Sequence, residues 1–165
     1  MTFNKMYSQE EQNLYNPAYI GTILYHAIRE YQSHNESGFH CALTYIVAPL
    51  ALYQRYSSNL PSTITTPIAG WVANNEGELI GFSESVSSYV NLVNFAILFL
   101  LGHGAIILSD DGKYRIPIDH MAKLPVFVNQ NKAFKRSFQS AGFLGRWFSG
   151  ASSVESIYAH FGIKP

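Results

Sequence analysis

Three short stretches bring together side chains that could take part in catalysis. His40 and Cys41 are adjacent and could form an imidazole–thiol pair, but neighbouring residues of a helix point about 100° apart and rarely meet. The run Gly-Phe-Ser-Glu-Ser at 81–85 resembles a nucleophile elbow, but it ends in serine and follows no evident strand. Asp119 and His120 have no third partner in the pattern. Core packing for the cysteine and surface positions for the others explain these patterns better, so no catalytic residue is predicted.

The sequence also lacks the spacing that a metal ion or a nucleotide requires. The six histidines are scattered, and none has a second His or Cys at ligand spacing, so no metal site is predicted. No GxxxxGK[ST] stretch is present, which argues against a P-loop ATPase, and no cofactor is predicted. Cys41 is the single cysteine and cannot form an internal disulfide, which favours a reducing, cytoplasmic location. The N-terminus shows no apolar leader. These patterns predict a protein that is not an enzyme.

Charge is unevenly distributed along the chain, although the formal net charge is zero. Residues 1–119 carry five basic and ten acidic side chains, whereas residues 120–165 carry six basic side chains and one acidic side chain. This asymmetry predicts a contact with an anionic partner, either DNA reached through an assembled complex or an acidic protein face. Lys132, Lys135 and Arg136 are the candidate contact residues. The alternative is a solvated basic face without a ligand.

The apolar run from Phe95 to Leu108 belongs to a predicted helix–hairpin element. Its length of about 14 residues falls short of the roughly 20 that a membrane-spanning helix needs, so we expect it to be buried in protein, without membrane contact. Apolar residues at three- and four-residue steps predict a helix over 83–101, capped by Ser83. Strands on either side of the turn at 109–112 would complete a winged-helix-like element. The helix has no Lys or Arg, so packing against protein is expected rather than insertion into a DNA groove.

Helix signals recur through the rest of the chain. Asn16 followed by Pro17 predicts an N-cap and first turn. Pro49 is expected to break or kink the second apolar stretch if that stretch is helical. Apolar spacing over 134–148 predicts one helix, or two broken helical turns around its glycines. The stretch 152–155, Ser-Ser-Val-Glu, reads as a capping box that opens a last short helix.

These elements predict a fold that is mainly α with one β-hairpin, an α+β class. Residues 1–15 are predicted to be a mobile segment. Residues 16–165 are predicted to form a single helical domain that contains the winged-helix-like element and has a basic helical part over about 120–165. Charged residues make up only 13% of the chain, about half the usual share, and a surface short of charge is often covered by a partner.

Two stretches carry a resemblance to a known family. One holds the start of the first long helix and the apolar stretch after it, and the other is the close of the chain. With the helix and hairpin between them, these stretches resemble the middle component of bacterial three-component ABC systems, which are related to Lamassu-type anti-phage systems. The resemblance covers roughly residues 13–165. The matching stretches are Asn16-Pro17-Ala18, Ala48-Pro49-Leu50, Leu144-Gly145-Arg146-Trp147-Phe148, Ile157-Tyr158 and Phe161-Gly162-Ile163-Lys164-Pro165.

The resemblance implies a small accessory subunit that joins an SMC-like ABC ATPase to an effector subunit, often a nuclease. It supplies no catalytic residue. The stretch 144–148 is then a candidate partner interface or structural motif, in which Arg146 is expected to pair with a carboxylate or stack on an aromatic ring. The alternative function is a stand-alone DNA-binding regulator with a winged helix, which needs basic or amide side chains on the exposed face of the helix at 83–101.

Overall fold

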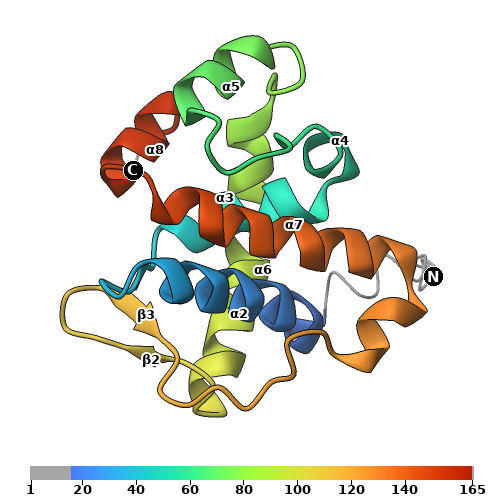
Figure 1. Cartoon of the computed structure of the whole chain (residues 1–165), viewed down its shortest axis with the longest axis vertical. Helices are drawn as coiled ribbons and strands as arrows, with labels where there is room; N and C mark the ends of the chain where they lie inside the picture. The colour runs from blue at the N-terminus through green and yellow to red at the C-terminus, as the bar shows by residue number, and fades with distance from the viewer. Residues whose placement is uncertain (1–15, 165) are drawn as a thin grey trace, which may run out of the picture.

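The computed structural model describes residues 16–164, and the segment predicted to be mobile, residues 1–15, lies outside the described part. Helices dominate, with one small antiparallel sheet, so the prediction of a mainly α fold with a β-hairpin is confirmed (Figure 1). The elements in chain order are α2 (Pro17–His34), β1 (Phe39–His40), α3 (Leu43–Leu52), α4 (Gln54–Ser57), α5 (Ile68–Asn74), α6 (Phe82–Gly102), β2 (Ile107–Leu108), β3 (Lys113–Arg115), the 3₁₀ helix η1 (Val126–Gln130), α7 (Lys132–Ser149) and α8 (Val154–His160).

Helices α2 and α7 lie side by side and run in the same direction across the middle of the molecule (Figure 1). The start of α2 contacts the start of α7, and the end of α2 contacts the end of α7: the Tyr19 ring stacks on Phe134, and the Asn35 side chain donates to the Ser149 carbonyl. α7 is a single continuous helix, so of the two forms expected for this stretch the unbroken one is observed. Gly142 and Gly145 do not interrupt it, because they lie where α7 meets α2 most closely.

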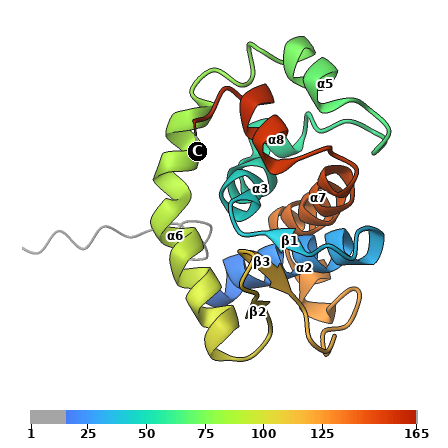
Figure 2. The same cartoon turned by 90° about the vertical axis from the view of Figure 1, so that its left-hand side faces the viewer.

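Helix α3 is the central element, between α6 on one side and α7 on the other (Figure 2). It is apolar on all faces and nearly all its side chains are buried, as expected of a helix enclosed by protein. Pro49 lies inside this helix, and the helix continues to Leu52, so the expected break is absent. The side chains packed around α3 hold the helix together past the hydrogen bond that proline cannot make.

Helix α6 crosses the α2–α7 pair and forms one outer side of the molecule (Figures 1 and 2). The prediction that Ser83 caps it is wrong. The N-cap residue is Gly81, which has a φ of +79°, and the Ser83 hydroxyl instead donates to the Glu84 carboxylate. The helix ends at Gly102, one residue past the predicted end. Gly104, with a φ of +66°, donates to the Leu101 carbonyl, and this closes the last turn.

The predicted hairpin is present, and it carries a third strand that the sequence did not reveal. β2 pairs with β3, and β3 also pairs with β1, with Phe39 opposite Tyr114. The turn between β2 and β3 depends on Gly112, which has a φ of +74°. β1 has only two residues, too few to show an alternating pattern, so no sequence signal marks it. The assignment of the helix–hairpin element to the winged-helix class stays a prediction.

The caps of the other helices follow local sequence closely. Asn16 accepts from the Ala18 amide with Pro17 in the first turn of α2, which confirms that prediction. The expected capping box is shifted by one residue: Ser153, not Ser152, caps α8 and accepts from the Ser156 amide.

Candidate functional site

The residues first considered for catalysis have structural roles or stand apart from one another. Asp119 accepts a hydrogen bond from the Tyr25 hydroxyl, and its carboxylate lies 3.7 Å from the Arg29 guanidinium. His40 Nδ1 accepts from the Ala42 amide, a local turn contact. Within residues 16–164, no three His, Cys, Asp or Glu side chains gather as a metal site would require.

A buried arginine pins the segment that follows the sheet. Arg29, in the middle of α2, is only 8% exposed. Its guanidinium donates to the carbonyls of Met121, Ala122 and Lys123 at 3.0–3.2 Å. Nη2 also reaches His26 Nδ1 at 2.9 Å, whereas the buried Nε has no hydrogen-bond partner among residues 16–164. The arginine therefore ties residues 119–123 to α2, and its charge is used inside the protein.

His26 completes this buried polar centre. Burial, together with the nearby Arg29 charge, lowers the pKa of His26 to about 4, so the ring is neutral at neutral pH and can accept from Arg29. The ring also stacks on Phe138 of α7, with centroids 3.8 Å apart and an angle of 5° between the planes. Gly142 provides the space for it, because a Cβ there would lie 2.5 Å from His26 Nε2. The polar centre is thus part of the α2–α7 contact.

The stretch 144–148 is built into the same contact. Leu144, Trp147 and Phe148 are buried, and the Trp147 indole donates to the Thr66 carbonyl at 2.7 Å. A Cβ on Gly145 would lie 2.2 Å from the Ala27 carbonyl oxygen, so the two helix backbones nearly touch there. Packing accounts for these four residues.

Arg146 is the partly exposed member of that stretch. Its Nη1 lies 2.7 Å from Glu30 Oε2 on α2, which confirms the expected pairing with a carboxylate. Each side chain keeps part of its surface in contact with solvent. Arg146 is therefore compensated within the chain, unlike the other cations of α7.

The three candidate contact residues lie together at the start of α7. Lys132 and Lys135 are exposed, and Arg136 is half-buried. At spacings of three and four residues they share one face of the helix. None of them forms an ion pair with a described residue, and Arg136 Nε is buried without a hydrogen-bond partner in this part of the chain. We call these three residues the basic stripe.

The expectation that the apolar run at 95–108 is buried is wrong for four of its nine large apolar side chains. Phe95 and Leu98 are 61% and 65% exposed, and Ile107 and Leu108 of β2 are about half exposed. The inner face of α6, with Val93 as one buried member, packs into the core. The outer face is apolar as well, so apolarity in the sequence did not mark burial. We call the exposed set of Phe95, Leu98, Ile107 and Leu108 the α6 face.

By length and composition alone, α6 could cross a membrane. It has 21 residues, and its most apolar stretch of 18 residues has a mean hydropathy of 1.6, with a third of that stretch buried within the protein. Core helices of soluble proteins meet the same criterion, so the criterion alone is weak evidence for a membrane span. The inner face of the helix is already packed against α2 and α3.

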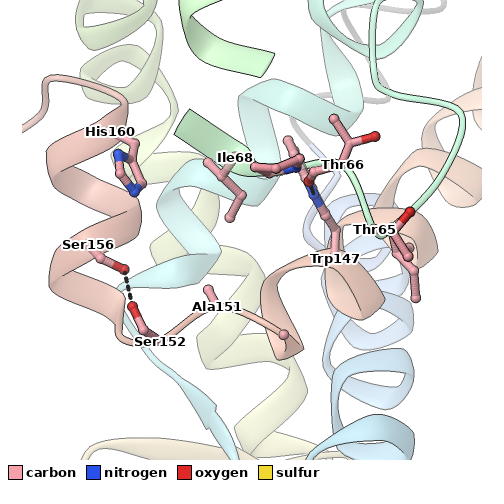
Figure 3. A pocket seen from close by; sticks show the side chains of 11 residues that line it. Thr65, Thr66, Ile68, Trp147, Ala151, Ser152, Ser156 and His160 are labelled. Atoms are coloured by element: carbon pink, nitrogen blue, oxygen red, sulfur yellow. Dashed lines mark hydrogen bonds between the residues drawn. The ribbon is translucent and has the colours of Figure 1, made fainter. Parts of the chain in front are cut away.

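A hollow of about 220 Å³ lies between the 64–68 segment, the end of α7 and α8 (Figure 3). Its polar lining comes mainly from hydroxyl groups, and the Ser152 and Ser156 hydroxyls are hydrogen-bonded to each other at 3.2 Å. His160 lies at one side of it (Figure 3). No carboxylate or thiol is among the lining residues, so a histidine in this hollow has no acidic partner there.

Comparison with known families gives a match over almost the whole chain. Residues 4–165 match the family described as ABC-three component (ABC-3C) system Middle Component 3. The chain belongs to this family. No curated protein and no solved structure matches it. The resemblance to the middle component of three-component ABC systems is thereby confirmed.

Membership in the Middle Component 3 family implies partner components, so the basic stripe and the α6 face are candidate contact surfaces. Sequence reasoning located the basic stripe but missed the exposure of the α6 face and the Arg29 centre. The local sequence carried no signal for the second, because the residues three and four positions from Arg29 are Tyr25, His26, Gln32 and Ser33, a set typical of a partly polar helix face.

Proposed function

We propose that this Middle Component 3 chain is a non-enzymatic accessory subunit that bridges an SMC-like ABC ATPase and an effector subunit, often a nuclease, in an anti-phage defence complex. ATP hydrolysis and effector chemistry lie in the partners. The subunit acts in the cytoplasm and needs no metal or cofactor of its own.

The observation that carries the proposal is the α6 face in a protein that belongs to a three-component system. No Asp, Glu, Lys or Arg occurs from Ser85 to Ser109, so α6 carries no charged side chain after its first turn. Figures 1 and 2 both place β2 next to the end of α6, and both residues of β2, Ile107 and Leu108, are exposed and apolar. A surface of this composition fits the apolar surface of another protein component.

The same face argues against a stand-alone DNA-binding regulator. A recognition helix presents basic and amide side chains to base edges and phosphates. The outer face of α6 offers serine and asparagine in its first half and apolar side chains in its second. The accessory role therefore explains α6 better.

The test is co-purification of the three components with a double substitution, Phe95→Asp and Leu98→Asp. Each exposed side chain contributes about 1–2 kcal/mol when a partner covers it, and an added carboxylate at a dry interface costs more. Affinity should therefore fall at least about 100-fold, since about 1.4 kcal/mol is a factor of ten.

The matched control is Ser87→Asp with Asn91→Asp, which adds the same charge to exposed positions on the first half of α6. Both double variants should melt close to the native protein, because all four side chains are already exposed. The control should co-purify with both partner components, and the α6-face variant should lose one of them. Retention of both partner components by the α6-face variant refutes this interface.

A further inference from the structure

We propose that the basic stripe binds the phosphodiester backbone of nucleic acid, so that the middle component itself contacts nucleic acid. The bridging proposal does not require this contact. Helix α6 and helix α7, which carries the basic stripe, lie on opposite sides of the molecule with α3 between them (Figure 2). A protein partner on α6 therefore leaves α7 accessible.

The first argument is that nothing in the described chain compensates these cations. The chain has eleven Lys and Arg in total, and three of them fall within five residues here. No acidic residue occurs from His120 to Val154, and none of the ion pairs among residues 16–164 includes the stripe. Every cation of α7 outside the stripe is accounted for, since Arg146 pairs with Glu30.

The second argument is that the arrangement destabilises the protein on its own. Cations in the first turn of a helix oppose its dipole, which costs about 0.3–1 kcal/mol each at exposed positions. Like charges three and four residues apart add a few tenths of a kcal/mol. The first turn of α7 contains no acidic residue that would offset this. An anion supplied from outside removes both costs.

The third argument concerns the kind of anion. Lysine is depleted from protein–protein interfaces, whereas lysine and arginine supply most phosphate contacts in nucleic-acid complexes. Exposed amides flank the stripe at Asn129, Gln130 and Gln139, and amide side chains also donate to phosphate oxygens. Lys132 and Arg136 are about 6 Å apart along the helix, which matches about two phosphate steps of roughly 3.4 Å on one strand.

The experiment measures binding of the purified full chain to a fluorescein-labelled 30-base-pair DNA duplex by anisotropy from 25 to 200 mM NaCl. A 30-base-pair RNA duplex forms a second arm. Three phosphate contacts predict a slope of log affinity against log salt of about −2.7, which is a loss of about 40-fold between 50 and 200 mM. Equal affinity for unrelated DNA sequences is also expected, since phosphate contacts carry no base information. If both duplexes give this slope, the shared backbone is the ligand; if the DNA duplex alone does, the ligand is DNA.

The variant is Lys132→Glu, Lys135→Glu and Arg136→Glu together. It should abolish binding but melt no lower than the native chain, because glutamate in the first turn favours the helix dipole. This opposite effect on binding and stability separates loss of a site from loss of the fold. The control is Arg55→Glu, Lys113→Glu and Lys164→Glu, which changes net charge equally outside α7 and should keep most of the affinity.

Absence of duplex binding by the native chain at 25 mM NaCl overturns the proposal. So does an equal loss in the control triple, because binding would then follow net charge alone. If the stripe variant keeps its affinity for the duplex but fails to co-purify with a partner component, the stripe contacts an acidic protein face and the nucleic-acid assignment is wrong. The α6-face variants do not enter this test, so its failure leaves the bridging proposal standing.

Discussion

The close contact of α2 and α7 at Gly145 gives the sharpest prediction of stability. A Cβ at this position lies 2.2 Å from the Ala27 carbonyl oxygen and 3.1 Å from the Tyr31 amide nitrogen. Carbon–oxygen contacts in proteins settle at about 3.3–3.6 Å. Gly145→Ala must therefore move the helices apart by about 1 Å, and both contacting groups are backbone atoms that cannot rotate away.

The magnitude follows from two opposing terms. Replacing glycine by alanine inside a helix contributes about 0.8–1 kcal/mol in favour of folding. Overpacking costs about 1–3 kcal/mol, and a gap of 0.5–1 Å forfeits a quarter to a half of the dispersion energy of the atoms along it. Because α2 and α7 share the most extensive helix contact of the described chain, we expect the overpacking cost to lie at the upper end of its range, and subtracting the gain leaves a net loss of about 2 kcal/mol. For a chain of this length that lowers the melting temperature by roughly 4–8 °C.

Thermal unfolding followed by circular dichroism measures the effect against two controls. Gly102→Ala lies in α6 with open space around the new Cβ and should leave the melting temperature unchanged or slightly raised. Gly142→Ala meets the side chain of His26 and should give an intermediate loss. If Gly145→Ala has the same melting temperature as Gly102→Ala, the backbones of α2 and α7 are not in contact at this position.

Two further predictions concern the buried polar centre. Arg29→Ala leaves three loop carbonyls without their donor and should lower the free energy of unfolding in urea by about 3 kcal/mol. A loss below about 1 kcal/mol would contradict the conclusion that Arg29 ties residues 119–123 to α2. Because the pKa of His26 is about 4 in the folded protein and about 6.5 when unfolded, the unfolded state binds the proton more readily between these values. The contribution of neutral His26 to the free energy of unfolding is therefore fully present above pH 6.5 and falls by up to about 3 kcal/mol towards pH 4. If the melting temperature of the native protein depends on pH over this range no more than that of His26→Gln, the effect is excluded.

Local signals predicted local structure well. The start of α2 follows from Asn16 and Pro17, which act through their own backbone and the next two residues. Gly162, with a φ of +67°, directly follows the C-cap of α8, where glycine is the favoured residue. The capping box failed by one residue because two consecutive serines can each serve as the cap, and the sequence does not distinguish them.

Burial was less predictable than helix formation. Period 3.6 identifies a buried face only when the opposite face is polar, and the second half of α6 is apolar on both faces. Nothing in the local sequence separates Ala96, which is buried, from Phe95, which is not. The same limit applies to Arg146 and Lys132: both belong to the basic part, but Glu30 compensates one of them from 116 residues away. Composition locates charge along the chain, whereas pairing depends on the fold.

The stretch 144–148, one part of the family resemblance, and the surfaces proposed for partners are separate parts of the molecule. Gly145, Trp147 and Phe148 hold α7 against its neighbours, whereas the α6 face and the basic stripe contribute little to the core. The residues of this stretch thus serve packing, and the proposed partner contacts depend on exposed side chains that are not needed for the core. It follows that substitutions in the stretch 144–148 should lose partners only together with the fold, while the charge variants of the two faces should each lose one partner at an unchanged melting temperature. A substitution within 144–148 that abolishes co-purification without lowering the melting temperature would place a partner contact on that stretch, and would contradict this separation.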